Sequence, residues 1–129
     1  MKNDIAKILI SEEQLKKRIR EMGAEIARDY AGKTPTMVCI LKGAVMFYTD
    51  LLRNIPIPLT MDFMAVSSYG NKTKSSGEVE IRKDLSTSIE GKDVIIVEDI
   101  VDSGFTLSYL TRMLASRGAA SIRLCTLLD

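Results

Sequence analysis

The side chains best able to do chemistry lie together between residues 97 and 107, in the run VEDIVDSGFTL. Glu98 and Asp99 supply two adjacent carboxylates, and Asp102 supplies a third a few positions later. Carboxylates accept hydrogen bonds from hydroxyl groups and are suitable ligands for a hydrated divalent cation. The segment therefore predicts a site for a ligand that carries hydroxyl groups, a metal ion or both.

The residues that follow the acids favour an anion. Asp102–Thr106 opens a predicted helix, and the free backbone N–H groups of a helix N-terminus bind phosphate well. Ser103 and Thr106 add hydroxyl groups, and Gly104 lets the backbone approach a ligand closely. An acidic strand end with an ordinary helix cap is the alternative interpretation. Three acids and a glycine turn directly after an apolar strand favour a site for a phosphorylated sugar.

This segment must sit where a buried strand turns into a helix. Residues 93–97, DVIIV, form an apolar run, and strands that are apolar on both faces belong to parallel sheets covered by helices. In such sheets, ligands bind at the carboxyl ends of the strands. In chain order, the sequence predicts a helix from Ser11 to near Gly32, a strand over 36–41, a helix over 45–53, strands over 60–67, 78–83 and 93–97, a helix that Gly118 stops, and a strand over 120–128.

The alternation of helices and apolar strands indicates an α/β fold with a mostly parallel sheet flanked by helices. Ser11 and Gln14 have the spacing of a capping box at the start of the first helix. In the strand over 60–67, the apolar alternation places Met61, Phe63 and Ala65 on one face. The polar residues 68–77 predict a mobile loop between two antiparallel strands. We expect residues 1–129 to form a single domain.

Composition excludes several classes of function. The 129 residues contain no histidine, which excludes Ser-His-Asp and Cys-His catalysis and histidine-ligated metals. A net charge of +1 argues against a nucleic-acid partner. Cys39 and Cys125 each lie in an apolar run, so we expect buried free thiols. Neither a secretory signal nor an apolar run long enough to span a membrane is present, and we expect a cytoplasmic protein with no membrane partner.

Four segments carry a resemblance to a known family. Residues 94–107, VIIVEDIVDSGFTL, closely resemble the phosphoribosyl pyrophosphate (PRPP) motif of the type I phosphoribosyltransferases. Residues 40–44, ILKGA, are similar to that family's pyrophosphate loop, and residues 67–70, SSYG, to its flexible closing loop. Residues 8–13, ILISEE, are similar to its usual opening. Together, over essentially the whole chain, they resemble the bacterial hypoxanthine-guanine phosphoribosyltransferases.

The resemblance implies a fold, a reaction and partners. The fold is the Rossmann-like type I phosphoribosyltransferase fold. The reaction is the Mg²⁺-dependent transfer of the 5-phosphoribosyl group from PRPP to hypoxanthine or guanine, which gives IMP or GMP and pyrophosphate in purine salvage. The partners are PRPP, a purine base and further copies of the chain in a homodimer or homotetramer. Phe47 and Tyr48 are equally compatible with a subunit interface and with the core.

The resemblance also assigns roles within the PRPP motif. Glu98 and Asp99 would hold the ribose hydroxyl groups and support Mg²⁺ bound to PRPP. Asp102 would act as general base or acid at the purine N7. The 5′-phosphate would be bound by Asp102, Ser103, Gly104, Phe105 and Thr106. Phe105 departs from the basic residue that some members carry, and we expect a small effect because backbone amides bind the phosphate.

Two further loops would complete the PRPP half of the site. Lys42 and Gly43 would contact the leaving pyrophosphate, and the family often has a cis peptide bond between Leu41 and Lys42. Ser68 and Tyr69 would close over the site and exclude water.

Three interpretations follow from the resemblance: an active enzyme, a nucleotide-binding regulator of the same fold, or an inactive fragment that retains only PRPP binding. The family's purine-contacting residues follow the last strand, and this sequence stops at Asp129. We therefore expect the chain to be short at its C-terminus relative to the family. The choice among hypoxanthine, guanine and xanthine depends on that segment.

Overall fold

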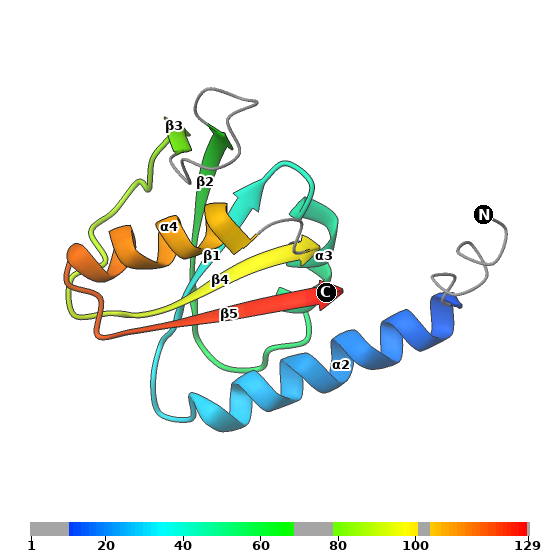
Figure 1. The fold of residues 1–129 in the computed structure, drawn as a ribbon. Helices are drawn as coiled ribbons and strands as arrows, with labels where there is room; N and C mark the ends of the chain where they lie inside the picture. The colour runs from blue at the N-terminus through cyan, green and yellow to red at the C-terminus, as the bar shows by residue number, and fades with distance from the viewer. Residues whose placement is uncertain (1–10, 69–78, 101–103, 129) are drawn as a thin grey trace, which may run out of the picture.

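The computed structural model describes residues 11–68, 79–100 and 104–128 of the chain (Figure 1). Its five-stranded sheet has the order β3-β2-β1-β4-β5. The strands are β1 (Thr36–Leu41), β2 (Thr60–Ser68), β3 (Val79–Lys83), β4 (Asp93–Ile100) and β5 (Ser121–Leu128). All neighbouring pairs are parallel except β2 with β3, which is antiparallel. The predicted α/β class and the mostly parallel sheet are confirmed.

Helices cover both faces of this sheet. They are α2 (Glu12–Asp29), α3 (Val45–Leu52) and α4 (Gly104–Ser116). Buried side chains of α2 and α3 pack with those of Met37, Cys39, Ile95 and Val97 on one face. Leu107, Leu110 and Leu114 of α4 pack on the other face, which Figure 1 shows toward the viewer. Within the described residues, no helix combines the length and apolar character needed to cross a membrane.

The burial of β4 explains its apolar sequence. Val94 and Ile96 point into the layer under α4, whereas Ile95 and Val97 point into the layer under α2 and α3. A strand covered on both sides has no face left for polar residues. The apolar run that the sequence analysis identified therefore matches the interior position of β4 between β1 and β5.

Helix α2 begins as predicted and ends slightly earlier. The backbone N–H of Gln14 donates to Ser11 Oγ, and that of Ser11 donates to Gln14 Oε1, both at 3.0 Å, which confirms the capping box. The helix ends at Asp29, and Tyr30 follows as its C-cap. Gly32, with a φ of 82°, lies in the turn after the helix, where a left-handed conformation favours glycine.

Strand β2 differs in detail from its prediction. Met61, expected on a packed face, is 53% exposed, whereas Asp62 is only 4% exposed and Met64 is fully buried. Phe63 is partly buried, and its ring contacts that of Tyr48 with centroids 5.3 Å apart. A charged residue can occupy the buried position because hydrogen bonds satisfy its carboxylate. Phe47 and Tyr48, left open between core and interface, lie in the core of this chain.

Candidate active site

The carboxylates of Glu98 and Asp99 lie near the carboxyl end of β4, and both side chains are half-buried. The last register pair between β1 and β4 joins Cys39 to Val97. Because the two strands are parallel neighbours, the residues after each of them emerge at the same edge of the sheet (Figure 1). This edge places the loop after β1 beside the two acids.

Gly43, in the loop after β1, lies close to Asp99. A methyl group built on Gly43 would lie 3.8 Å from Oδ1 and 3.8 Å from Oδ2 of Asp99. The predicted pyrophosphate loop and one of the predicted ribose carboxylates are therefore in contact distance, although they are far apart in the sequence. A single small ligand can reach both.

The carboxylate pair also has an electrostatic effect on the strand beneath it. Burial, together with the negative charges of Glu98 and Asp99, raises the pKa of the Cys39 thiol to about 11. The backbone N–H of Asp99 donates to Glu98 Oε1 at 3.3 Å. Both acids therefore place negative charge at this end of β1, which favours a cation or a hydroxyl donor there.

Lys42 directly precedes Gly43 in the same loop. The peptide bond between Leu41 and Lys42 is cis, as the resemblance implies. The side chain of Lys42 is exposed to solvent, and the carbonyl of Lys42 accepts a hydrogen bond of 3.1 Å from the N–H of Val45 at the start of α3. The loop after β1 therefore carries an exposed lysine directly before the glycine that lies near Asp99.

The donor set fits Mg²⁺ only as part of a complex with substrate. Magnesium is usually held by one or two carboxylates together with substrate phosphates. Glu98 and Asp99 provide such carboxylates, and a Cβ atom at Gly43 would come no closer than 3.8 Å to the Asp99 oxygens. Among the described residues, no group of three or more Cys, Asp or Glu side chains gathers to form a metal cage. The remaining ligands of an ion at this position would be oxygens of the substrate and water.

The other predicted site residues are placed to different extents. Helix α4 begins at Gly104, so Phe105 and Thr106 belong to its first turn, and the Thr106 side chain is half-buried. Ser68 is the last residue of β2. Asp102, Ser103 and Tyr69 lie outside the described residues. The structure thus brings the Gly43 position close to Asp99, with Lys42 and Glu98 as their direct neighbours in the chain.

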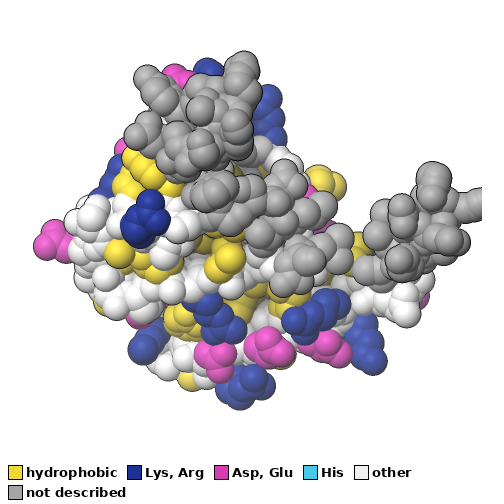
Figure 2. Space-filling view, viewed as in Figure 1, with side chains coloured by type: hydrophobic (Ala, Val, Ile, Leu, Met, Phe, Trp, Pro, Cys, Tyr) yellow, Lys and Arg dark blue, Asp and Glu magenta, His cyan; other side chains and the backbone are white. Residues whose placement is uncertain are grey.

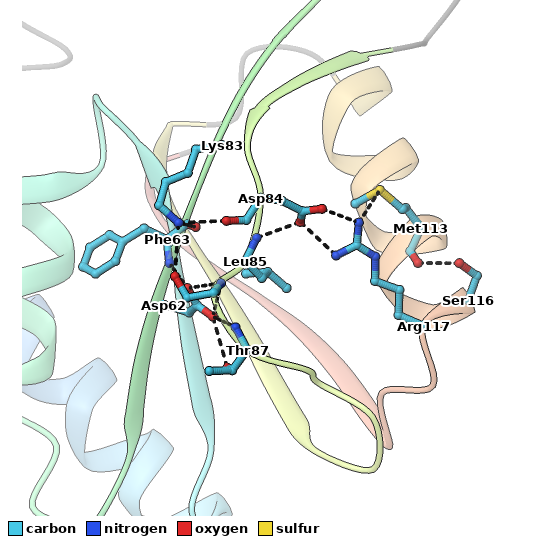
Figure 3. Close-up of polar contacts among 10 residues, drawn as sticks. Asp62, Phe63, Lys83, Asp84, Leu85, Thr87, Met113, Ser116 and Arg117 are labelled. Atoms are coloured by element: carbon cyan, nitrogen blue, oxygen red, sulfur yellow. Dashed lines mark hydrogen bonds and ion pairs between the residues drawn. The ribbon is translucent and has the colours of Figure 1, made fainter.

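Sequence reasoning missed Asp62, a buried carboxylate of β2. It accepts hydrogen bonds from the backbone N–H groups of Phe63 at 2.8 Å, Ser86 at 3.0 Å and Thr87 at 3.3 Å, and from the Thr87 hydroxyl at 3.3 Å (Figure 3). Burial opposes ionisation, but these donors outweigh it, and the pKa of Asp62 is lowered. An aspartate inside an apolar strand was the signal that could have revealed it.

A second missed contact continues from the same segment. Asp84 accepts two hydrogen bonds from the guanidinium of Arg117, at 2.8 Å and 2.9 Å (Figure 3). Arg117 directly follows α4, and Asp84 directly follows β3. Together with Asp62, this pair ties residues 84–87 between β2 and the C-terminal end of α4. These contacts stabilise the fold and involve neither Glu98 nor Asp99.

The visible face of the molecule has mixed charge. Figure 2 shows Lys and Arg side chains interspersed with Asp and Glu side chains along the lower edge, where α2 lies in Figure 1. Arg123 of β5 and Asp29 of α2 contribute an ion pair of 2.9 Å. On this face, the charges do not gather into a basic stripe of the kind that nucleic-acid binding requires.

Comparison with known proteins identifies close relatives. Residues 7–129 match the family described as phosphoribosyl transferase domain. The chain is 55% identical over 129 residues to the hypoxanthine-guanine phosphoribosyltransferase of Bacillus subtilis and spans 72% of that protein. It is 58% identical to the bifunctional protein TilS/HprT of Listeria innocua, again over 129 residues, and spans 20% of it.

A solved structure gives the same answer for the fold. The crystal structure of a hypoxanthine phosphoribosyltransferase from Staphylococcus aureus superposes with a TM-score of 0.87 at 47% sequence identity. The match covers 92% of this chain and 64% of that one. The chain therefore spans less than two thirds of this solved relative and a fifth of the Listeria protein.

Proposed function

Because this chain belongs to the phosphoribosyltransferase family, among the hypoxanthine-guanine phosphoribosyltransferases, we propose that it transfers the 5-phosphoribosyl group of PRPP to hypoxanthine or guanine. The products are IMP or GMP and pyrophosphate, and the reaction serves purine salvage. We propose further that it acts in the cytoplasm as a homodimer or homotetramer built from single-domain subunits. The free, buried state of Cys39 and Cys125 is compatible with a reducing compartment.

One observation carries the proposal: the Asp99 carboxylate lies 3.8 Å from the position that a Cβ atom would take at Gly43. PRPP presents a pyrophosphate group and two ribose hydroxyl groups on adjacent carbons. A site for it must bring an anion-binding loop next to a hydroxyl-binding carboxylate. The proximity of the Gly43 position to Asp99, at the ends of β1 and β4, supports this arrangement.

The chemistry follows from the charges that develop during the reaction. Displacement of pyrophosphate from C1 builds positive charge on the ribose and negative charge on the leaving group. Glu98 and Asp99 hold the ribose hydroxyl groups near the developing cation, and Lys42 stabilises the departing anion. Mg²⁺ bound with PRPP supplies additional neutralisation of the pyrophosphate charge. Glu98 and Asp99 support the complex of Mg²⁺ and PRPP through their carboxylates.

The remaining roles belong to residues of the motif and of the closing loop. Asp102 accepts or donates the proton at the purine N7, and the amides and hydroxyls of residues 102–106 bind the 5′-phosphate. Ser68 and Tyr69 close over the site and exclude water, which would otherwise react at C1. These assignments rest on the family motif and on the start of α4 at Gly104.

The test is nucleotide formation by the full chain. Purified protein is incubated with PRPP, Mg²⁺ and hypoxanthine, guanine or xanthine in turn, and products are separated by chromatography. Asp102→Asn should lower kcat by about 100-fold to 10,000-fold, the contribution of a positioned general acid or base. Lys42→Ala should lower kcat/KM for PRPP. Lys92→Ala, an exposed lysine in the turn before β4, is the matched control and should leave both values unchanged.

Two outcomes would contradict the proposal. If Asp102→Asn retains the full rate, the role of that residue in proton transfer is wrong. If the unmodified chain forms no nucleotide with any base, the proposed transferase activity is wrong for this chain. If the chain forms no nucleotide but calorimetry shows that it binds PRPP, it is a PRPP-binding protein of the same fold.

A further inference from the structure

Glycines in a fold usually have a structural reason, and two such reasons account for most of those in the described part of this chain. Gly32, Gly91 and Gly118 have positive φ values, which side chains rarely tolerate. Gly23 lies so close to the backbone of Asn54 that a Cβ atom would collide with its carbonyl group. In these four positions, the folded chain itself requires glycine.

Neither reason applies to Gly43. Its φ lies outside the left-handed region that favours glycine. Among the described residues that are not its chain neighbours, the nearest atoms to a Cβ at this position are the two oxygens of Asp99, at the ordinary van der Waals distance of 3.8 Å. Alanine would therefore fit at residue 43 against the described residues of the ligand-free protein. What a methyl group at this position could obstruct is a group of a bound ligand.

The geometry indicates which group of a ligand a methyl group at residue 43 would obstruct. The Cβ position is equidistant from the two oxygens, so it lies in the plane that bisects the Asp99 carboxylate. A donor that contacts both oxygens lies in the same plane, at about 2.5–2.7 Å for a charge-assisted O–H···O bond. A methyl group 3.8 Å from these oxygens leaves no room for such a donor on this side. A methyl group at residue 43 and a donor that approaches Asp99 from the same side therefore exclude each other.

We infer that Gly43 is a positioning residue, whose missing side chain keeps one side of the Asp99 carboxylate open for an O–H donor of the bound substrate. The donor is either a ribose hydroxyl group or a water molecule held by the Mg²⁺ of the PRPP complex. The inference rests on the proposed function and adds to it. It assigns Gly43 a role in access to Asp99, separate from contact between its backbone and pyrophosphate.

The test is a double-mutant cycle on ligand binding. Isothermal titration calorimetry measures the Kd of PRPP with Mg²⁺ for wild type, Gly43→Ala, Asp99→Ala and the double variant. Gly43→Ala should weaken binding about tenfold or more, as expected for one lost charge-assisted hydrogen bond. In the Asp99→Ala background, the same substitution should change Kd by less than about twofold, because no carboxylate remains to be covered.

Controls separate obstruction of the carboxylate from loss of structure. The thermal midpoint of ligand-free Gly43→Ala should equal that of wild type, and Gly43→Ser serves as a second variant with a slightly larger group. Gly91→Ala, in the turn at the amino end of β4, should lower the thermal midpoint through its positive φ without changing Kd. This comparison shows that reduced stability alone does not weaken PRPP binding.

Titration with PRPP in EDTA identifies the donor. A ribose hydroxyl predicts that Gly43→Ala loses affinity with and without the metal, whereas a metal-bound water predicts a loss only with Mg²⁺. Either result supports the inference. Unchanged affinity in Gly43→Ala, or an equal loss in both backgrounds of the cycle, overturns it and leaves the proposed function standing. Failure of the wild-type chain to bind PRPP overturns both.

Discussion

At the scale of single residues, Asp62 shows how the fold stabilises a buried charge. Only 4% of the residue is exposed, yet its carboxylate is held by backbone N–H groups of three residues and by one hydroxyl group. The donors belong to residues 63, 86 and 87, so the carboxylate connects β2 to the segment after β3. A carboxylate with this many donors is favoured in its ionised form even when water is excluded.

Replacing Asp62 with asparagine should destabilise the protein by about 2–3 kcal/mol at pH 7, because the amide retains one acceptor oxygen and turns an NH₂ group toward N–H donors. Urea unfolding followed by circular dichroism measures the change. Asp93→Asn, at an exposed pair with the Ser121 hydroxyl, is the matched control and should cost under about 1 kcal/mol. A loss at Asp62 no larger than that of the control would contradict this interpretation.

The same group gives a signed pH dependence. The folded-state pKa of Asp62 is lowered, so its contribution is present above the unfolded-state pKa of about 3.9 and is lost as the pH falls from there through the folded-state value. Asp84, whose pKa is lowered chiefly by hydrogen bonding to Arg117, acts in the same direction. Wild type should therefore lose stability below about pH 4 more steeply than Asp62→Asn. If the stability of wild type and that of Asp62→Asn fall equally as the pH is lowered, the contribution assigned to the Asp62 carboxylate is wrong.

At the scale of elements, the packing of α2 on residue Asn54 depends on Gly23. The glycine is buried on the inner face of the helix, and a Cβ atom there would collide with the Asn54 backbone just after α3. Since backbone atoms move less readily than a flexible side chain, the two elements would have to separate. Glycine destabilises a helix, but at this position it allows α2 to lie close to the Asn54 backbone.

Gly23→Ala should therefore lower the free energy of unfolding by about 1–3 kcal/mol through overpacking. The sign of this stability change is informative, since alanine in an exposed helix position is favoured over glycine by about 1 kcal/mol. Urea denaturation provides the measurement. Lys17→Ala, at an exposed position of the same helix, should change stability by less than about 0.5 kcal/mol. An increase in stability for Gly23→Ala would show that α2 is not held this closely.

At the scale of the whole molecule, the sheet separates two buried layers, one under α2 and α3 and one under α4. Both cysteines belong to the first layer. Cys39 is fully buried on the central strand β1, whereas Cys125 is 8% exposed on β5. Burial raises the pKa of both thiols, so each is protonated and covered at neutral pH.

Both thiols should therefore resist alkylation in the native protein at pH 8 and react fully in urea. Mass spectrometry after a timed exposure to iodoacetamide distinguishes them through the single variants Cys39→Ser and Cys125→Ser. We expect Cys39 to react at the rate of global unfolding and Cys125 no more slowly, since β5 lies at the edge of the five-stranded sheet. Rapid labelling of Cys39 would contradict the packing of this layer.

Local chemistry made much of this protein predictable from its sequence. The capping box of Ser11 and Gln14, the apolar run of β4 and the helix after the acidic motif depend on neighbouring residues. Such features can be predicted because backbone hydrogen bonds and side-chain periodicity act over short distances in the chain. The family resemblance, carried by contiguous motifs, belongs to the same category.

Tertiary structure decided what depends on residues that meet across the fold. The register of β1 with β4 brings Gly43 to Asp99, and β2 turns Asp62 inward while leaving Met61 exposed. No local pattern specifies these outcomes, because burial of a strand face depends on the helices and loops that cover it. The sequence by itself predicted the type of site and determined the elements that carry its motifs. Only the packing of distant segments determined that a glycine faces a carboxylate there.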